Sequence, residues 1–567
     1  MIEIDKKSED KVQKRIKELA KRAWAKTCKN FYYPPLNEPL YIFDYTRKEG
    51  FYIDPKHWQI TMNLANTPPF TENKEYFNYF HAITLHEVSH YQIIPYDGLL
   101  NAKLLRMAIK HVNQIFAPIV VNIFSDLIID TKLFQDYPDL MKWEIETTYN
   151  YVIQGNKNQL SKFSMFLFKA YEKIFNINFI GSELYPELDL LVDKIIKIIS
   201  KDFEDETKWE QKVSKVAYHL RGLINETFTL ISPGVSTSKG KRRKKTDESI
   251  IIELPEDILE LMDNPFENKN SDKLNRDNID GLNVKAEEFA KNVPYSEFGA
   301  PASQAGILID GNSLATWYRG IAKDLINIKI FEKRPSGKVP IYPETWRIGD
   351  PMEQLDVPLS LSNYPVMIPN ITTKKWVLEE GSGMMVEKQL PDILIVLDSS
   401  GSMRWNIKGK TDNARGQYHT AIIASFAALH QAASKGVKFS IINFSNHPDI
   451  CQWTRNIYEA ENTILRYQGG GTVLPIKGMV DQCNKAEKKV LVLLITDFGL
   501  YNWEKSKKKF LELANKGHFI IGFFIGAQKI PKSKFKTLLD KVKFYPIKNI
   551  KKLIDLVIEN VNEHFSI

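Results

Sequence analysis

The sequence predicts a multidomain protein in which a mainly helical N-terminal domain is followed, after a polar linker, by a C-terminal α/β domain with a mostly parallel sheet. First, a chain of 567 residues exceeds what one hydrophobic core usually supports. Second, apolar residues recur at helical spacing through most of the first 232 residues. Third, from residue 389 onward continuous apolar runs alternate with helical segments, which is typical of parallel strands covered on both faces.

Composition narrows the class of protein before any motif is considered. The hydrophobic fraction of 43% and the charged fraction of 26% are ordinary for soluble proteins, and no stretch reaches the roughly 18 apolar residues of a membrane span. The segment Met1–Lys7 lacks the basic-then-apolar layout of a secretory signal. The cysteines Cys28, Cys451 and Cys483 have no paired spacing. We therefore expect a cytoplasmic protein with no membrane contact and no disulfide framework.

The N-terminal domain is expected to cover residues 1–232. Short strands are predicted within 37–62, where aromatic and aliphatic runs are bounded by Pro and Asn. Helical spacing, with Pro95 and Pro118 as breaks, predicts the other elements. These helices are expected at 9–30, 73–94, 99–116, 119–133, 188–203 and 209–230.

A change of composition marks the next part of the chain. The stretch 262–283 is rich in Asn, Asp and Lys, and residues 233–300 are interpreted as a charged polar linker. Its basic run, Lys239–Lys245, is the one candidate for a nucleic-acid contact, but such runs are usually solvated, so nucleic acid is not the expected partner. Residues 301–388 form a connecting segment that the sequence assigns to neither domain.

The C-terminal domain, residues 389–567, has the clearest alternation of strands and helices. Strands are predicted at 392–397, 437–444, 490–496 and 519–525, and helices near 413–435, 474–487, 503–516 and 549–564. Ligands of open α/β sheets bind beyond the carboxyl ends of the strands. The residues that follow these strands are therefore the first place to search for a site.

Five oxygen-bearing side chains follow the strands of this domain. Asp398 ends the first strand and precedes Ser400 and Ser402, while Asp497 ends a later strand. A glycine loop between them leads into Thr472. An all-oxygen set of this kind suits a hard cation such as magnesium. The sequence therefore predicts a magnesium site at this edge of the sheet.

The Asp-x-Ser-x-Ser motif with its distant Thr and Asp resembles the metal-ion-dependent adhesion site (MIDAS) of von Willebrand factor A (VWA) domains, which have a Rossmann-like α/β fold. The resemblance covers the whole C-terminal domain. It implies that Ser400, Ser402 and Thr472 bind Mg²⁺ directly, whereas Asp398 and Asp497 act largely through water. It also implies that an Asp or Glu side chain of a protein partner completes the coordination shell.

A second motif, His86-Glu87-Val88-Ser89-His90, lies in a predicted helix of the N-terminal domain. Residues four apart on a helix lie one turn above each other, so the two imidazoles can bind one ion. Zinc lowers the pKa of a bound water to about 7, and a neighbouring carboxylate can accept its proton. The motif therefore predicts a zinc hydrolase site with His86 and His90 as ligands and Glu87 as the catalytic base.

The third zinc ligand is expected from the segment 121–130. Asn122, Asp126 and Asp130 recur every four residues in a stretch that is otherwise apolar, where a carboxylate is costly unless it is paired or bound to metal. We expect Asp126 to be the ligand, and we expect Asp130 and Asn122 to contact and orient the ligands without binding the ion. The choice of Asp126 over Asp130 stays open, and His111 and His219 remain possible ligands.

The two N-terminal segments resemble those of gluzincin peptidases, in which a ligand carboxylate is followed four residues later by an aspartate, although here Asp replaces Glu. A zincin-like helical domain followed by a linker and a VWA-like domain is similar to prokaryotic metallopeptidases associated with MoxR-type AAA+ ATPases. The resemblance implies a peptide or protein substrate and such an ATPase as partner. The sequence has no Gly-x-x-x-x-Gly-Lys-Ser/Thr loop of its own for a nucleotide.

Two functions follow from these patterns. The leading hypothesis is a zinc-dependent metallopeptidase whose VWA domain binds a protein partner through magnesium and works with an AAA+ ATPase. The alternative is a non-enzymatic adaptor or scaffold of an AAA+ chaperone or metal-insertion complex, with a structural or degenerate zinc site. A fourth protein ligand, for instance His111, would favour the alternative, because structural zinc sites are closed by four protein ligands.

Overall fold

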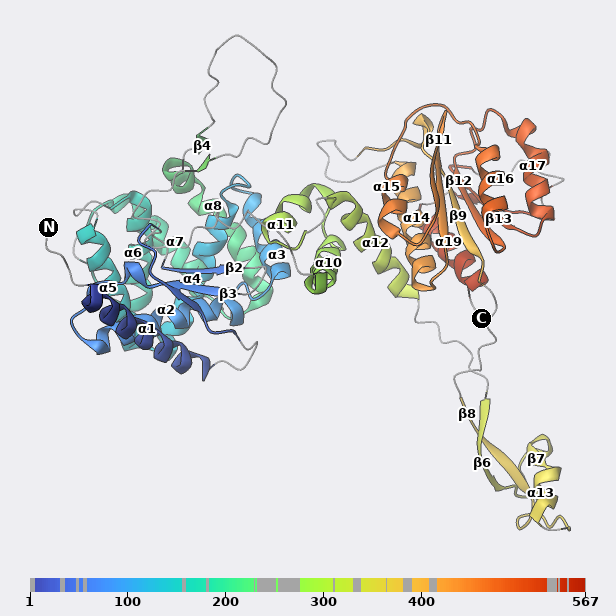
Figure 1. Ribbon diagram of the computed structural model, residues 1–567, viewed down its shortest axis with the longest axis horizontal. Coiled ribbons are helices and arrows are strands. Elements are labelled where there is room, and N and C mark those ends of the chain that lie inside the picture. The colour runs from blue at the N-terminus through green and yellow to red at the C-terminus, as the bar shows by residue number, and fades with distance from the viewer. Residues whose placement is uncertain are drawn as a thin grey trace, which may run out of the picture. The chain divides into compact units, whose positions relative to one another are not determined.

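The chain divides into two compact units, mainly at Gly320, and each unit is described by itself. The computed structural model is shown in Figure 1. It describes residues 6–30, 36–46, 50–54, 59–155, 160–179, 183–228, 230–231, 251–252, 276–308, 312–329, 338–363, 365–380, 390–406, 416–527, 538, 541–547 and 550–565. The basic run of the linker, Lys239–Lys245, lies outside these residues. Within them, no helix combines the length and the apolar character needed to cross a bilayer.

The first unit is mainly helical, as the sequence predicts. Helix α4 is its centre, because its apolar residues cover nearly all sides and it packs against α2, α3, α5, α6, α7 and α8. The helices are α1 (Lys6–Cys28), α2 (Asn73–Gln92), α3 (Gly98–Ile109), α4 (Ala117–Asp136), α5 (Pro138–Gly155), α6 (Lys162–Phe175), α7 (Asp189–Ser200) and α8 (Trp209–Thr227).

Helix α2, which carries the His-Glu-x-x-His motif, lies between two hydrophobic clusters. A capping box formed by Glu72 and Glu75 defines its start. One side of α2 packs through Phe80 and Val88 against α1 and a three-stranded sheet, whose order is β1 (Leu40–Ile42), β3 (Gln59–Asn63), β2 (Phe51–Asp54). The other side packs through Leu85 against the cluster around α4. Packing on two sides fixes the direction in which the motif residues point.

Helices also form in the segment 276–300, which the composition placed in the linker. Helix α10 (Arg276–Ala290) and helix α11 (Gly299–Gln304) both contact α3. Phe289 and Ala286 of α10 are buried, so a helical apolar face exists among the polar residues that dominate the composition. Helix α12 (Ser313–Lys329) follows and spans the boundary between the two units.

The second unit contains a small β module in the segment 301–388, where the sequence predicts no element. Its strands are β6 (Lys338–Thr345), β7 (Leu355–Asp356) and β8 (Lys374–Glu380), in the order β6-β8-β7, with the short helix α13 (Val357–Asn363) after β7. Strands β6 and β8 form a long antiparallel pair. Residues 338–380 are called the β6–β8 module below.

A six-stranded sheet forms the rest of the second unit, and all of its strands are parallel except the edge strand β11. Helices α14 and α19 cover one face and contact each other, while α16 and α17 cover the other (Figure 1). The strand order is β11 (Pro448–Thr454), β10 (Phe439–Phe444), β9 (Asp392–Asp398), β12 (Val490–Thr496), β13 (Phe519–Ile525), β14 (Lys543–Ile547). The helices are α14 (Gln417–Ser434), α15 (Ile457–Ile464), α16 (Ile476–Lys485), α17 (Trp503–Asn515) and α19 (Ile550–Phe565).

This strand order creates a switch point between β9 and β12. After β9 the chain continues to β10 on one side, and it later returns to place β12 on the other side. Loops that leave neighbouring strands in opposite directions open a crevice at the carboxyl ends of those strands, where α/β sheets bind ligands. Asp398 ends β9, and Asp497 directly follows β12.

Candidate metal centres

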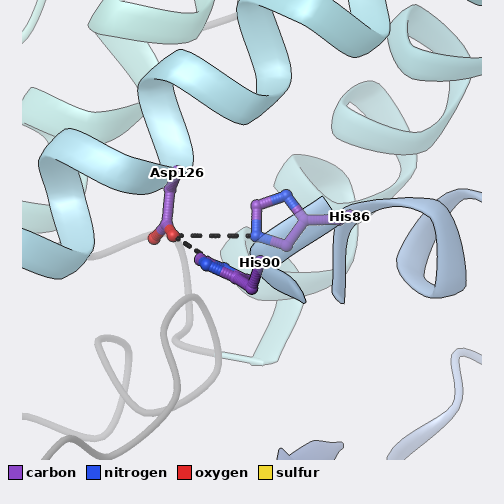
Figure 2. A group of neighbouring side chains, drawn as sticks. All are labelled: His86, His90 and Asp126. Carbon is purple, nitrogen blue, oxygen red and sulfur yellow. Dashed lines mark ion pairs between the residues drawn. The ribbon is translucent and has the colours of Figure 1, made fainter. Parts of the chain in front are cut away.

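Helices α2 and α4 bring His86, His90 and Asp126 together in the first unit (Figure 2). The Nε2 atoms of His86 and His90 lie 3.7 and 3.3 Å from Oδ1 of Asp126. The three potential ligand atoms all lie within 4.8 Å of one another, and they form the one group of at least three His, Cys, Asp or Glu ligand atoms found among the described residues. His86 and His90, which are four residues apart on α2, therefore lie next to Asp126 of α4, the carboxylate that the sequence predicts as the third ligand.

The other nitrogen of each imidazole is held by an oxygen acceptor. Nδ1 of His86 donates to Oδ1 of Asp130 at 2.8 Å, and Nδ1 of His90 donates to the carbonyl oxygen of Ile94 at 3.0 Å. Because these acceptors keep the proton on Nδ1, a neutral ring directs the lone pair of Nε2 towards Asp126. This pattern is common behind metal-binding histidines.

The atoms at the centre of this group fit a zinc ion. Oδ1 of Asp126 is buried and accepts no hydrogen bond, although two Nε2 atoms lie near it. Lone pairs and a carboxylate that face one another are unfavourable unless a cation lies between them. Ligands 2.0–2.2 Å from zinc at a tetrahedral angle are roughly 3.3–3.6 Å apart, close to the separations found here.

The charges around the group also favour a cation. Burial disfavours the charged imidazole of His86, but Asp130 and Asp126 outweigh burial and raise the pKa of His86 well above its usual value. Burial would raise the pKa of Asp126, yet its interactions with the nearby His86 and His90 outweigh burial and lower that pKa. The group thus stabilises a positive charge, carried by a proton or by a metal ion.

Glu87 and Asn122, the other residues singled out by the sequence, lie beside this group. Glu87 is half-buried next to His86 on α2, and burial raises its pKa while His86 and His90 partly offset the effect. Nδ2 of Asn122 donates to Oδ2 of Asp126 at 3.4 Å. Asn122 therefore holds the carboxylate oxygen that does not face the histidines.

Neither of the other histidines considered as ligands joins the group. Nε2 of His111 lies 2.8 Å from Oγ of Ser214 in α8. His219 contacts the ring of Tyr218 edge-on. Both residues have contacts of their own and are not part of the group found among the described residues.

The structure adds residues that the sequence did not indicate. Burial raises the pKa of Glu144 on α5 to about 7, although Thr148 opposes the shift by donating 2.7 Å to Oε1, and the Asp130 charge adds to it. Tyr171 on α6 interacts with Asp130, and burial with the nearby carboxylates raises the pKa of its hydroxyl well above the usual value. No motif or spacing links these residues to the site, since only the packing of α5 and α6 on α4 brings them near it.

The second candidate centre begins at Asp398, which is fully buried at the end of β9. Its Oδ1 accepts from the backbone N–H of Ser400 at 2.9 Å, and its Oδ2 accepts from Oγ1 of Thr496 at 2.5 Å. Oγ of Ser400 lies 3.1 Å from Oγ of Ser402. Burial raises the pKa of Asp398 to about 6, against the effect of the bonds from Thr496 and Ser400 and with a further contribution from Asp497.

A glycine loop closes over this motif. The N–H of Gly401 donates to the carbonyl of Gly470 at 2.8 Å, and the N–H of Gly469 donates to the carbonyl of Ser399 at 2.8 Å. A Cβ atom on Gly401 would lie 2.9 Å from the carbonyl oxygen of Gly469, so only glycine permits this approach. The double hydrogen bond fixes the loop that leads into Thr472.

Thr472 and Asp497 meet at the same edge of the sheet. Oγ1 of Thr472 and Oδ1 of Asp497 lie 3.8 and 3.4 Å from the point where a Cβ atom of Gly499 would stand. The negative charge of Asp497 also contributes to the raised pKa of Asp398. The structure thus places the side chains of Asp398, Ser400, Ser402, Thr472 and Asp497 at this edge of the sheet, and Thr496 is a hydrogen-bond partner of Asp398 that the sequence did not indicate.

Comparisons with known proteins leave the family of this chain open. No family model matches the sequence, and no curated protein matches it. Solved structures resemble parts of the chain, among them the pilus adhesin SpaC from Lactobacillus rhamnosus GG, with 12% identity over 31% of this chain and 30% of that chain and a TM-score of 0.25. A point mutant of the minor pilin PilB from Streptococcus sanguinis matches with 15% identity over 34% of this chain and 65% of that chain and a TM-score of 0.26.

The vWF domain of the type V pili tip protein Mfa5 from Porphyromonas gingivalis matches with 10% identity over 31% of this chain and 96% of that domain, at a TM-score of 0.26. The chain covers less than two thirds of the length of the adhesin and of the minor pilin. At TM-scores this low the likenesses decide nothing. Fold and function must follow from this chain's own strands and side chains.

Proposed function

We propose that the first unit is a zinc-dependent peptidase, with His86, His90 and Asp126 as zinc ligands and Glu87 as the catalytic base. The observation that carries this proposal is the pair of Nε2 atoms that face an unbonded, buried carboxylate oxygen while both Nδ1 atoms are held from behind. A zinc ion there would supply a Lewis acid that polarises a peptide carbonyl and acidifies a water molecule.

The chain's own residues perform the remaining tasks of peptide hydrolysis. Glu87 accepts the proton of the attacking water and passes it to the departing amine. Burial raises the pKa of Glu87, which helps this carboxylate to hold the proton between the two steps. Asp130 keeps the imidazole of His86 in one tautomer and orientation.

The number of protein ligands favours catalysis over a structural role. Structural zinc sites are closed by four protein ligands, whereas catalytic sites leave one position for water or substrate. In the part of the chain that the structure describes, the group contains three candidate ligands and no fourth. A position therefore remains for water or for a substrate carbonyl.

The test compares proteolysis by the wild-type protein and by Glu87→Gln, both loaded with one equivalent of zinc, on casein and on a fluorogenic peptide library. We expect equal zinc content and a loss of cleavage of at least about 100-fold in Glu87→Gln, the usual contribution of general acid–base catalysis. Equal cleavage by both proteins, or none by the wild type on any substrate, would reject the peptidase.

A second candidate is a non-enzymatic adaptor whose zinc stabilises the helical unit. It is favoured by the low exposure of the ligands, 22% and 17% for the His86 and His90 side chains and 12% for Asp126. Inactivity towards every substrate, combined with a fall in melting temperature when zinc is removed, would support the adaptor.

For the second unit we propose a VWA domain that binds a protein partner through magnesium. Ser400, Ser402 and Thr472 would hold the ion, with Asp398 and Asp497 behind them, and an acidic side chain of the partner would complete the shell. The support is the oxygen set at the switch point between β9 and β12. A MoxR-type AAA+ ATPase is the proposed partner, as the resemblance to metallopeptidases with a VWA-like domain implies.

This proposal is tested by the binding of a MoxR-type ATPase from the same organism to immobilised wild-type and Asp398→Ala proteins. We expect binding that requires Mg²⁺, is removed by EDTA and is lost in Asp398→Ala. Unchanged binding in the variant would contradict the proposed site.

A further inference from the structure

The most exposed large apolar residue among those described, Tyr501, lies beside the candidate magnesium centre. It is 79% exposed. Its N–H donates to the carbonyl oxygen of Thr472 at 3.0 Å, so it pairs with a residue proposed to hold the ion. A Cβ atom on Gly471 would lie 3.1 Å from Cε2 of Tyr501, which places the ring against the glycine loop. An exposed aromatic ring therefore touches the loop that carries a candidate ligand.

Hydrogen bonds hold the backbone that carries this ring. Oδ1 of Asn502 accepts from the N–H of Leu474 at 2.8 Å, and Nδ2 of Asn502 donates to the carbonyl oxygen of Leu474 at 2.9 Å. Together with the bond from Tyr501 to Thr472, they join the segment after β12 to the segment after the glycine loop. The ring is therefore held on an ordered backbone before a partner binds, which lowers the entropic cost of association.

The charges at this edge of the sheet favour one kind of partner. The segments around the centre, 398–406, 445–448, 468–477 and 497–505, carry three acidic and three basic side chains, so their formal charges cancel. A bound Mg²⁺ makes this edge positive, which attracts a carboxylate and repels a second cation. The six charged residues are Asp398, Asp497, Glu504, Arg404, Lys477 and Lys505.

The same charges decide what packs on the ring of Tyr501. An aromatic ring can bind the face of a cation or an apolar side chain, and a positive surrounding disfavours the cation. Val473, which directly follows Thr472, is 37% exposed and adds apolar surface at this edge. A large aliphatic or aromatic side chain of the partner therefore fits best next to the carboxylate.

We propose that this edge recognises an extended acidic segment of a protein partner, in which a large apolar side chain within three residues of the magnesium-binding carboxylate packs on Tyr501. The inference rests on the proposed magnesium-dependent function of the second unit and adds the apolar half of the recognised sequence. Side chains two residues apart in an extended segment lie on one face, roughly 7 Å apart. One short segment thus reaches both the ion and the ring, because Tyr501 and Thr472 are hydrogen-bonded neighbours.

The first test selects peptides from a random phage-displayed library on the full chain in Mg²⁺ and elutes them with EDTA. We expect an acidic residue with a large apolar residue within three positions. The apolar preference should be lost on Tyr501→Ala. The control is Tyr342→Ala, which removes another exposed tyrosine, in the β6–β8 module, and should select the same sequences as the wild type.

The second test measures the affinity of the most enriched peptide by fluorescence anisotropy in Mg²⁺. We expect a loss of at least about tenfold in Tyr501→Ala, and a similar loss in the wild type when the apolar residue of the peptide is replaced by Gly. The two changes made together should cost no more than either alone, because they remove the same contact. Circular dichroism and thermal melting check that the variants are folded.

The outcomes separate this inference from the function on which it rests. Peptides that EDTA elutes and that share an acidic residue but no apolar neighbour overturn the inference and leave the magnesium-dependent function intact. Lys or Arg in place of the apolar residue, or additive losses in the affinity measurements, also overturn it. If EDTA elutes no enriched peptide, recognition through magnesium is wrong, and the inference is wrong with it.

Discussion

The two candidate metal centres are built from different parts of the protein. In the first unit three candidate ligand side chains project from two helices, and their outer atoms are held by other side chains and one carbonyl. In the second unit the oxygen atoms come from loops at strand ends, and backbone hydrogen bonds between Gly401, Gly469, Gly470 and Ser399 hold them. The helical centre depends on side-chain partners, whereas the strand-end centre depends on backbone geometry.

This difference predicts opposite sensitivities. Removing a side chain behind the ligands should damage the helical centre, because that side chain orients a ligand. Adding a methyl group to the backbone should damage the strand-end centre, because its loops approach too closely for a Cβ atom.

The largest effect is expected at Asp126. Asp126→Ala removes a ligand and leaves two Nε2 atoms without their carboxylate, so zinc affinity should fall by about 4 kcal/mol, roughly a thousandfold. Asp130→Ala removes only the hydrogen-bond acceptor of His86 Nδ1 and should lower zinc affinity by roughly 10- to 100-fold. Competition with a zinc chelator measures both. A larger loss of zinc affinity in Asp130→Ala than in Asp126→Ala would show that Asp130 is the ligand and Asp126 the supporting residue.

Glu144 tests the electrostatics behind the helical centre. Its pKa is raised from 4.5 to about 7, so between these values the folded state binds more protons than the unfolded state, and stability falls as pH rises through this window. Glu144→Gln should therefore raise the stability of the metal-free protein at pH 8 by up to about 3 kcal/mol and change little at pH 4.5. Thermal melting at both pH values measures this. A variant less stable at pH 8 would show that the carboxylate is stabilised when charged.

The smallest effect is expected at Gly401. Gly401→Ala places Cβ 2.9 Å from the carbonyl oxygen of Gly469 and should displace the glycine loop. We expect the binding of Mg²⁺ or Mn²⁺ to weaken by about 1–2 kcal/mol as a result. Gly222 on α8 is the matched control, because no atom lies within 4 Å of its Cβ position. Gly222→Ala should leave Mn²⁺ affinity unchanged and stabilise the helix by about 0.5–1 kcal/mol. Calorimetry that finds equal Mn²⁺ affinity in both variants would contradict the role of the loop.

Local periodicity predicted more of the fold than composition did. The strands at 490–496 and 519–525 are continuous apolar runs, and the structure places β12 and β13 there. Composition placed 276–300 in the linker because the stretch 262–283 is rich in Asn, Asp and Lys, whereas the apolar face of α10 depends on a few residues such as Phe289. The edge strand β11 was not predicted, since half-buried residues produce a weaker pattern than buried ones.

The candidate ligands were predictable because each has a local signal in the sequence, such as a spacing of one helical turn, an isolated carboxylate in an apolar stretch or a position after a predicted strand. His86 and His90 are one turn apart, and Asp126 was indicated by a carboxylate in an apolar stretch. Residues that reach the centre only through tertiary packing, such as Glu144 and Tyr171, have no such signal. Supporting residues are therefore the part of a site that sequence alone misses.

Zinc content per chain, measured by plasma mass spectrometry, tests the central claim most directly. The protein is purified after growth with zinc, alongside His86→Ala and the control His111→Ala, whose imidazole bonds to Ser214 instead. The account predicts about one zinc per chain in the wild type and in His111→Ala, and none in His86→Ala. Zinc retained by His86→Ala, or absent from all three proteins, would contradict it.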